Sequence, residues 1–570
     1  MNRVRALGAW LGARLTARTV VIAASVCLVL LHLALVLHAT KRAPIFTQYP
    51  LAWIDFATHA EQTLRVTEAM DRFGKTWLYD PQQLAGFPSG TVFDADNKGW
   101  ELWTYAWWKL GVPKATAFNL FVLFAHLLVV PVFWVSARLF RLGKAESLGA
   151  AALALGVWYF DGLARWSWHS GAIAFCVVSC TFVLPLGLLY RYLRDGGWLR
   201  AAALALWMAV LHLIHPSVFV ILAVPMIALY VRSFRTLPRA RHATVWAVAL
   251  FTIATNAWWI VIALRFVEYV TEHQALFVGK PSYLATDYVG LTQDLNATGI
   301  LSNRTGFRFL AWFGAAAGLA FWRRDRDDRV LPLGLGLLTL LGIAYLGGHS
   351  ELLRQIQQYR NVVPAAFLAC IPAAAFFGYL AREGALRKAP RAAQAGLAIA
   401  TLIAIPHLAA DVLYFFPRAV PKVPPLTTGT PPPLSAYGFI HQADDEYRHG
   451  PAPAHMAKVA DWVREHDDGQ GRFLVEWWVL SEYLLARTNA QVLGGFHEIN
   501  MKHAAANLFS KRHKGERTRE HVRAYFEDYA IAWVILNETE PNDIAWGEEL
   551  ELVEKIPPQR IYKTRVPIQL

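Results

Sequence analysis

The segment between residues 41 and 115 combines acids, histidines and aromatic residues at spacings that could support chemistry. Asp55 and His59 are four residues apart, so on a helix both side chains would lie on one face. A carboxylate placed there can take a proton from a hydroxyl nucleophile, with His59 orienting it or acting in its place. The alternative is that Asp55 is a first-turn acid that stabilises free backbone amides at the start of a helix.

Asp94 and Asp96 form an acidic pair in the same segment, within the sequence FDADN. Carboxylate oxygens at this spacing can bind a hard divalent cation such as Mg or Mn, particularly when phosphate oxygens complete the coordination shell. Short acidic turns that contain asparagine also occur without any metal. The pair is therefore a candidate metal site, with a simple turn as the alternative.

Basic residues and histidines also fall in short segments between apolar runs. They are Arg165 and His169 in ARWSWHSG, His215 in LHLIHPS and Arg360 in RQIQQYRN. A guanidinium can bind a phosphate through two parallel hydrogen bonds, which makes Arg360 the best candidate for a phosphate ligand. The other three are expected to line the same phosphate site. The alternatives are an interfacial anchor for Arg360 and helix-capping hydrogen bonds for the histidines.

Membrane-spanning helices must position these residues, because the chain is 55% hydrophobic and its apolar runs alternate with short basic clusters. A span needs about 20 apolar residues. Eleven runs are predicted to be spans, near residues 20–39, 116–137, 147–160, 171–190, 201–214, 216–231, 245–264, 308–322, 330–347, 362–381 and 392–416.

The orientation of these spans can be predicted from their flanking charges. Lysine and arginine concentrate after every second run, so the positive-inside rule predicts a cytoplasmic N-terminus. Segments 41–115 and 265–307 and the region after residue 416 would then lie outside the cytoplasm. The net charge of +13 is therefore attributed to topology, and nucleic-acid binding is not expected.

The chain is predicted to divide into a transmembrane domain over residues 1–416, a proline-rich linker over 417–435 and a soluble α/β domain over 436–570. In the last of these, apolar spacing predicts helices at 456–466 and 521–529 and buried strands at 472–478 and 530–536. Its sequence contains no Walker loop, zinc-ligand spacing or nucleophile elbow. An independently catalytic domain is therefore not expected there.

The layout resembles that of GT-C glycosyltransferases, a class with a first-loop aspartate after the first span, surface helices and a C-terminal external domain. The closest resemblance is to bacterial and archaeal members whose first loop runs Asp-X-X-X-His, then Gly followed by Trp or Pro, then Gly-Phe-Pro or Gly-Tyr-Pro. The matching residues here are Asp55, His59, Gly74, Trp77, Gly86, Phe87 and Pro88. The expected fold class is thus an α-helical polytopic membrane protein, GT-C-like with about 11 transmembrane helices, carrying a C-terminal soluble α/β domain.

The resemblance implies that Asp55 is the catalytic base on the acceptor and that the donor is a polyprenyl-phosphate-linked sugar. This sequence differs from two known branches of the GT-C class. The adjacent acidic pair of protein O-mannosyltransferases is missing, and FDADN does not clearly match the metal-binding position known in oligosaccharyltransferases.

The sequence therefore predicts an inverting membrane glycosyltransferase in the bacterial inner membrane. It would move a sugar to a glycan, lipid or protein acceptor of the cell envelope on the extracytoplasmic face, with membrane lipids as further partners. The rival prediction is a non-enzymatic lipid or saccharide transporter, or an envelope-assembly scaffold. A transporter should carry ionisable groups near mid-membrane, whereas the charges here gather at the ends of the apolar runs.

Overall fold

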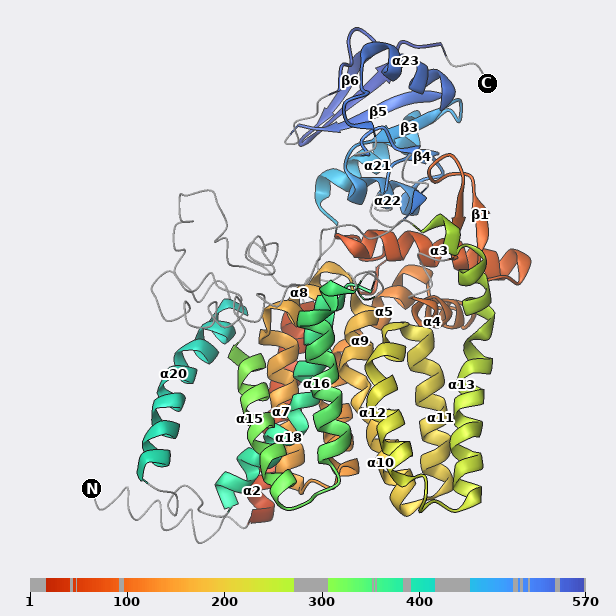
Figure 1. Ribbon diagram of the computed structural model, residues 1–570. Coiled ribbons are helices and arrows are strands. Elements are labelled where there is room, and N and C mark those ends of the chain that lie inside the picture. The colour runs from red at the N-terminus through yellow and green to blue at the C-terminus, as the bar shows by residue number, and fades with distance from the viewer. Residues whose placement is uncertain are drawn as a thin grey trace.

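The computed structural model describes residues 17–40, 45–47, 49–91, 97–270, 306–350, 353, 356–382, 391–415, 452–495, 501–502, 506–510, 513–538 and 544–567. The molecule has two layers (Figure 1). Long helices form a bundle, and an α/β region stands above one end of it. Two further helices, α3 (Asp55–Phe73) and α4 (Lys98–Lys109), lie between the layers.

All eleven predicted apolar runs are helical. They form α2 (Ala17–Thr40), α5 and α6 (Lys114–Leu127, Val129–Leu139), α7 (Lys144–Phe160), α9 and α10 (Ile173–Thr181, Val183–Asp195), α11 (Trp198–Ile214), α12 (Ser217–Ser233), α13 (Arg239–Arg265), α15 (Gly306–Arg324), α16 (Val330–Leu346), α18 (Val362–Arg382) and α20 (Arg391–Phe415).

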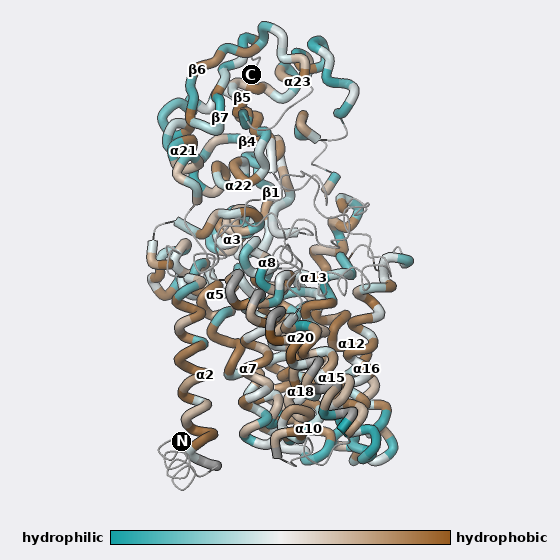
Figure 2. Tube along the Cα trace, turned by 90° about the vertical axis from the view of Figure 1, so that its left-hand side faces the viewer, coloured by the Kyte–Doolittle hydropathy of each residue, from teal (hydrophilic) through white to brown (hydrophobic). Residues whose placement is uncertain are grey.

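Within the described ranges, five helices are long and apolar enough to cross a membrane. The number rises to seven if two bent pairs each count as one span, namely α5 with α6 at 45° and α7 with α8 (Gly162–Ser170) at 63°. Helices α11 and α12 are shorter and also apolar. Figure 2 shows apolar residues along the bundle and hydrophilic ones at its lower end. The chain is therefore an integral membrane protein.

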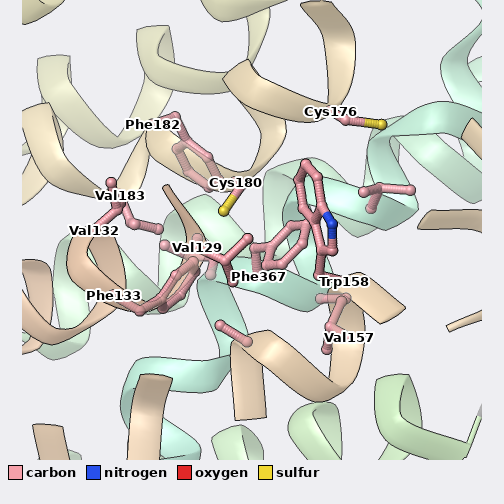
Figure 3. Packing of buried hydrophobic residues seen from close by; sticks show 14 of the residues in the cluster. Val129, Val132, Phe133, Val157, Trp158, Cys176, Cys180, Phe182, Val183 and Phe367 are labelled. Carbon is pink, nitrogen blue, oxygen red and sulfur yellow. The ribbon is translucent and has the colours of Figure 1, made fainter. Parts of the chain in front are cut away.

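Aromatic and small side chains fill the bundle core. Trp158 of α7, Cys180 of α9 and Phe367 of α18 pack in one apolar cluster (Figure 3). All four cysteines of the chain are free thiols. Helices α15 and α18 approach so closely that a Cβ at Gly318 would lie 2.1 Å from the Pro372 carbonyl oxygen, so only glycine fits there.

The first loop forms two helices, in keeping with the surface helices of a GT-C-like layout, and one hairpin that was not predicted. Helix α3 ends at Gly74, whose φ of 61° is the left-handed conformation expected of a C-terminal glycine. The hairpin pairs β1 (Leu78–Asp80) with β2 (Phe87–Ser89). Helix α3 was expected simply to lie on the membrane surface. Both of its faces are instead buried, because Phe56 belongs to the bundle core and Ala57 to the core of the α/β region.

The C-terminal region holds a five-stranded sheet in the order β4-β3-β5-β7-β6. Its strands are β3 (Arg472–Val475), β4 (Val492–Leu493), β5 (Ile531–Asn537), β6 (Leu550–Ile556) and β7 (Gln559–Thr564), and its helices are α21 (Ala454–His466), α22 (Trp478–Arg487) and α23 (Arg519–Asp528). Strand β3 is parallel to β4 and β5, and the remaining pairs are antiparallel. The strand predicted over 472–478 ends at Val475, because helix α22 begins at Trp478.

The first loop extends this sheet at its β4 edge. The Val492 amide donates to the Gln82 carbonyl at 2.7 Å, and the Leu84 amide donates to the Val492 carbonyl at 3.0 Å. Arg65 of α3 donates to the Leu485 carbonyl of α22 at 3.2 Å. The α/β region is thereby attached directly to the loop that carries Asp55.

Candidate functional site

Asp55 is the first residue of α3, on the membrane face that carries α3 and α4, called here the Asp55 face. The preceding residue, Ile54, has a φ of 50°, which is rare for a β-branched residue and marks a strained backbone. Such strain persists only where surrounding contacts enforce it, and it concentrates at functional sites. One enforcing contact comes from Gly171 after α8, where a Cβ would lie 2.5 Å from the Phe56 nitrogen and 3.0 Å from the Asp55 Cβ.

The Asp55 carboxyl is partly buried, and no described residue donates a hydrogen bond to it. Removal from water raises its pKa to about 6, and the positive charge of Arg360 opposes the rise. The structure agrees only in part with the alternative that Asp55 is a helix-capping acid. Asp55 lies in the first turn of α3, but Ile54 holds the N-cap position and no side chain caps the amides.

His59 lies one turn further along α3 and faces α4. The side-chain amide nitrogen of Asn97 donates to its Nδ1 at 2.8 Å, so the proton of the neutral ring is on Nε2. Its ring packs 5.7 Å from that of Trp100. Burial, aided by the charge of Arg360, lowers the pKa of His59 to about 4, so the ring is neutral at pH 7.

Arg360 lies in the short 3₁₀ turn Gln358–Asn361 that leads into α18. Its guanidinium stacks 5.6 Å from the ring centroid of Phe175 on α9. The positive charge of Arg360 lowers the pKa of Asp55, His59 and His215, so this cation lies near all three. The guanidinium is partly exposed, as a phosphate ligand must be.

His215 occupies the turn between α11 and α12. Its ring lies 5.7 Å from that of Phe175, and the Ser217 amide donates to its Nδ1 at 3.1 Å. Burial, with Arg360 and His59 nearby, lowers its pKa to about 3, so it offers an Nε2 proton and no positive charge. Asp55, His59, His215 and Arg360, which are 305 residues apart in sequence at their extremes, therefore gather at one face of the membrane.

Arg165 and His169 lie one turn apart on α8 and interact electrostatically. Arg165 is fully buried, with 0% of its surface exposed, while His169 is partly exposed. The metal candidates Asp94 and Asp96 lie outside the described residues. Among those that are described, no three histidines, cysteines or acids group closely enough to hold a metal ion.

A buried ion pair that was not predicted from the sequence, between Asp161 and Arg308, fixes the start of α8. Asp161 at the N-cap of α8 accepts hydrogen bonds from the Leu163 and Ala164 amides at 3.1 and 2.9 Å. Arg308 of α15 donates two more, at 2.8 and 2.9 Å, and both side chains are 1% exposed. A charged residue within an apolar run needs a partner, so the presence of Arg308 in the run 308–322 could have indicated a buried ion pair.

The α/β region covers the site from the other side. Arg65 on α3 forms ion pairs with Glu61 at 3.1 Å and Asp80 at 3.2 Å while it contacts α22. The Arg487 guanidinium of α22 lies 3.3 Å from the ring centroid of Tyr49, shortly before Asp55. Helix α3 is therefore fixed between two packed layers.

This arrangement combines a carboxylate that titrates near pH 6, a partly exposed cation and two neutral imidazoles. A carboxylate that accepts no strong hydrogen bond is available to take a proton from a bound group. A guanidinium beside it can hold an anionic group such as a phosphate. The site is therefore suited to base-assisted attack on an anionic substrate.

No family model and no curated protein sequence matches the chain. Solved structures match its fold. The oligosaccharyltransferase of Archaeoglobus fulgidus, tethered with an acceptor peptide, aligns over 91% of this chain and 69% of its own, with a TM-score of 0.54 and 10% identity. The same enzyme in complex with zinc and sulfate aligns over 90% and 68%, with a TM-score of 0.52 and 12% identity.

ArnT of Cupriavidus metallidurans, bound to undecaprenyl phosphate, aligns over 94% of this chain and 97% of its own, with a TM-score of 0.50 and 12% identity. The oligosaccharyltransferase and ArnT are both membrane glycosyltransferases of the GT-C superfamily. The expected fold class is confirmed, because this chain has the GT-C fold with a C-terminal α/β sheet region.

Proposed function

We propose that this chain is an inverting glycosyltransferase that moves a sugar from a polyprenyl-phosphate donor to an envelope acceptor. One observation carries the proposal. In a GT-C fold, Asp55 stands on α3 with a pKa raised to about 6, no hydrogen-bond donor among the described residues, and the cation Arg360 nearby. The acceptor is a glycan, a lipid or a protein.

The reaction is a single displacement. The Asp55 carboxylate takes the proton of the acceptor hydroxyl while the hydroxyl oxygen attacks the anomeric carbon of the sugar. The bond from that carbon to the phosphate oxygen breaks, and polyprenyl phosphate leaves with the electron pair. Arg360 stabilises the charge that develops on the leaving phosphate. One displacement inverts the configuration at the anomeric carbon.

Asp55 is a better base than His59 because of the two pKa values. A base with a pKa of about 6 is mostly ionised at pH 7 and still binds a proton usefully, whereas a pKa of about 4 makes His59 a much weaker base. His59 instead offers its Nε2 proton to an acceptor or donor oxygen. The proposal therefore assigns His59 an orienting role beside the base.

The donor phosphate is assigned to Arg360 together with Arg165, His169 and His215. Arg360 is partly exposed and can contact the phosphate directly. His169 and His215 are partly exposed as well and can donate ring protons. Arg165 is buried, so its part is to contribute positive charge from within the bundle.

Asp94 and Asp96 are the proposed ligands of a divalent cation, Mg or Mn. A complex of the Archaeoglobus fulgidus oligosaccharyltransferase contains zinc, which supports metal use in this fold. Such a cation would neutralise charge on the donor phosphate. Sensitivity to EDTA tests this assignment.

The proposed location is the bacterial inner membrane, with a cytoplasmic N-terminus and the Asp55 face outside the cytoplasm. The distribution of lysine and arginine along the chain supports this orientation. The proposed division is a membrane domain over residues 1–416, including loop 41–115, a linker over 417–435, which lies outside the described residues, and an extracytoplasmic α/β domain over 436–570.

The test is to incubate membranes containing the chain with a panel of radiolabelled polyprenyl-phosphate sugars, with and without EDTA. Release of label from at least one donor is expected. Asp55→Asn should lower the rate by about 10²- to 10⁴-fold, the usual contribution of a general base. Asp71→Asn, the same change on an exposed part of α3, should leave the rate unaltered. No release from any donor, or full activity of Asp55→Asn, would refute the proposal.

A lipid or saccharide transporter is the second candidate, and the bent pairs α5–α6 and α7–α8 favour it, because broken helices line the sites of many transporters. Movement of labelled lipid-linked sugar across proteoliposomes, without cleavage of the sugar, would identify it.

A further inference from the structure

Two buried polar side chains of α3 have no hydrogen-bond partner among the described residues. They are the Thr58 hydroxyl and the Gln62 carboxamide, which are 1% and 2% exposed. Both the oxygen and the nitrogen of the Gln62 amide are unpaired. A buried amide or hydroxyl without a partner costs free energy, so such groups are uncommon in native proteins and call for an explanation.

Their position on α3 connects them with the proposed base. Thr58 follows Asp55 by three residues and Gln62 follows Thr58 by four, so the three side chains form one row along the helix. Asp55 is partly exposed, whereas Thr58 and Gln62 are buried. The row therefore has an accessible end at Asp55 and a buried end at Gln62.

Two other buried polar residues of α3 are paired within the protein. The Glu61 carboxylate accepts a hydrogen bond from Arg65 at 3.1 Å, and the Thr67 hydroxyl donates to the Leu64 carbonyl at 2.8 Å. Lack of a partner is thus not a general property of polar groups on this helix. It occurs in the row that starts at Asp55.

The row leads away from the proposed donor phosphate. The Arg360 charge acts on Asp55 and His59, which lie in the first turns of α3. Gln62 is seven residues from Asp55, a distance of about 10 Å along a helix axis. A donor sugar held between Arg360 and Asp55 lies at the start of the helix, so a group bound at Gln62 belongs to the acceptor.

We propose that Thr58 and Gln62 form a subsite that binds a neutral sugar residue of the acceptor. This inference rests on the proposed glycosyl transfer and names its acceptor, which is a glycan chain. A carboxamide and a hydroxyl can each donate and accept hydrogen bonds, and neither carries a charge. Side chains four residues apart on a helix are about 5–6 Å apart, which is comparable with the width of one sugar ring.

The chemistry of the two side chains favours a sugar over other groups. A hydrocarbon chain would leave both of them unpaired, and a charged group would find no opposite charge in Thr58 or Gln62. The hydroxyls of a sugar ring each donate and accept. One ring can therefore satisfy both side chains together.

The first test follows the labelled sugar into its product. Membranes of the native organism are incubated with a radiolabelled polyprenyl-phosphate sugar that the chain uses, and the product is partially hydrolysed in acid. We expect the label in a disaccharide, because its new bond joins it to another sugar. A label bonded directly to a peptide or a lipid would overturn the subsite while leaving glycosyl transfer intact. Absence of any transfer would refute the proposed function, and the subsite with it.

The second test removes the unpaired atoms with little change in side-chain size. Gln62→Met and Thr58→Val should each lower the transfer rate by about fivefold, the value of one hydrogen bond, without changing the donor concentration that gives half the maximal rate. Without substrate, both should raise the unfolding temperature by about 2 °C, because a buried group with unmet hydrogen bonds is removed. Slower transfer by a more stable protein is the signature of a binding subsite.

Two matched controls make the same substitutions elsewhere. Gln559 of β7 is also unpaired among the described residues and 1% exposed, so Gln559→Met should raise the unfolding temperature and leave transfer unaltered. Thr67 is paired, so Thr67→Val should neither raise that temperature nor slow transfer. Wild-type transfer by both Gln62→Met and Thr58→Val, or an equal loss in Gln559→Met, would overturn the proposal.

Discussion

Asp55 and Asp161 are two aspartates at the starts of helices on one membrane face, each influenced by an arginine, and they are built in opposite ways. Asp161 is 1% exposed and accepts four hydrogen bonds, two from backbone amides and two from Arg308. Asp55 is partly exposed, accepts none from the described residues and interacts with Arg360 only through space. A satisfied carboxylate supports architecture, and an unsatisfied one is available for chemistry.

The two sites are also connected in the structure. Asp161 begins α8, and Gly171 ends it against the backbone of Asp55 and Phe56. The Arg308 pair fixes the start of α8 to α15, and the far end of this short helix then presses on the first turn of α3. The architectural carboxylate therefore positions the reactive one.

The largest effect should come from breaking the buried pair. Asp161→Asn removes the carboxylate charge that accepts two hydrogen bonds from the buried Arg308 guanidinium, so the free energy of unfolding should fall by about 3–5 kcal/mol. Denaturant or thermal unfolding in detergent measures it. Asp55→Asn is the matched control and should cost no stability, because no hydrogen bond of the described residues is lost. Equal destabilisation by the two substitutions would remove the contrast between them.

Moving Asp55 without altering it should have the next largest effect. Gly171→Ala places a Cβ against the first turn of α3 at a φ of 114°, so Asp55 must shift. A displacement near 1 Å can lower a rate by about 10²-fold, and we expect that loss in kcat/KM. Gly74→Ala also falls at a positive φ but has no atom within 4 Å, so sugar transfer should stay at the wild-type rate. A normal rate for Gly171→Ala would show that the contact does not position the base.

The pH profile should report Asp55 directly. Because the base must be ionised, kcat/KM should fall about tenfold per unit as the pH drops below about 6, and reach a plateau above it. Arg360 lowers the pKa of Asp55, so Arg360→Gln should move the inflection to higher pH, besides weakening donor binding. Arg72→Gln, an exposed change on α3, should leave the inflection in place. If Arg360→Gln left the inflection unmoved, the Arg360 charge would not act on the pKa of Asp55.

The smallest effect should come from the His59 orientation. Asn97→Ala removes the hydrogen bond that fixes the His59 ring, and one such bond contributes about 1 kcal/mol, or about fivefold in kcat/KM. The measurement is the transfer rate at pH 7.5, with the unfolding temperature as a check on the fold. A loss as large as that of Asp55→Asn would instead make His59 part of the catalytic base.

Local patterns in the sequence were enough to predict that the apolar runs are helical and that Asp55 and His59 share one helix face, because helical periodicity acts within a few residues. The Asp161–Arg308 pair joins residues 147 positions apart, and no local pattern indicates which acid a buried arginine will meet. Strand β4 has only two residues and pairs through the fold, so it too was missed. All of the assigned site roles stay predictions, namely those of Asp55, His59, Arg165, His169, His215, Arg360 and the pair Asp94 and Asp96.

The strand-like segment Gln82–Leu84 that completes the sheet beside β4 has a consequence for how the chain matures. Its partner Val492 is made some 400 residues later, and the Arg65 contact to Leu485 spans 420 positions. Contacts this distant close late, because the long intervening chain must be ordered first. Helix α3 therefore reaches its final position only once synthesis has reached the C-terminal sheet. Until then, a partly synthesised chain would already have its spans in the membrane but would lack a correctly positioned Asp55.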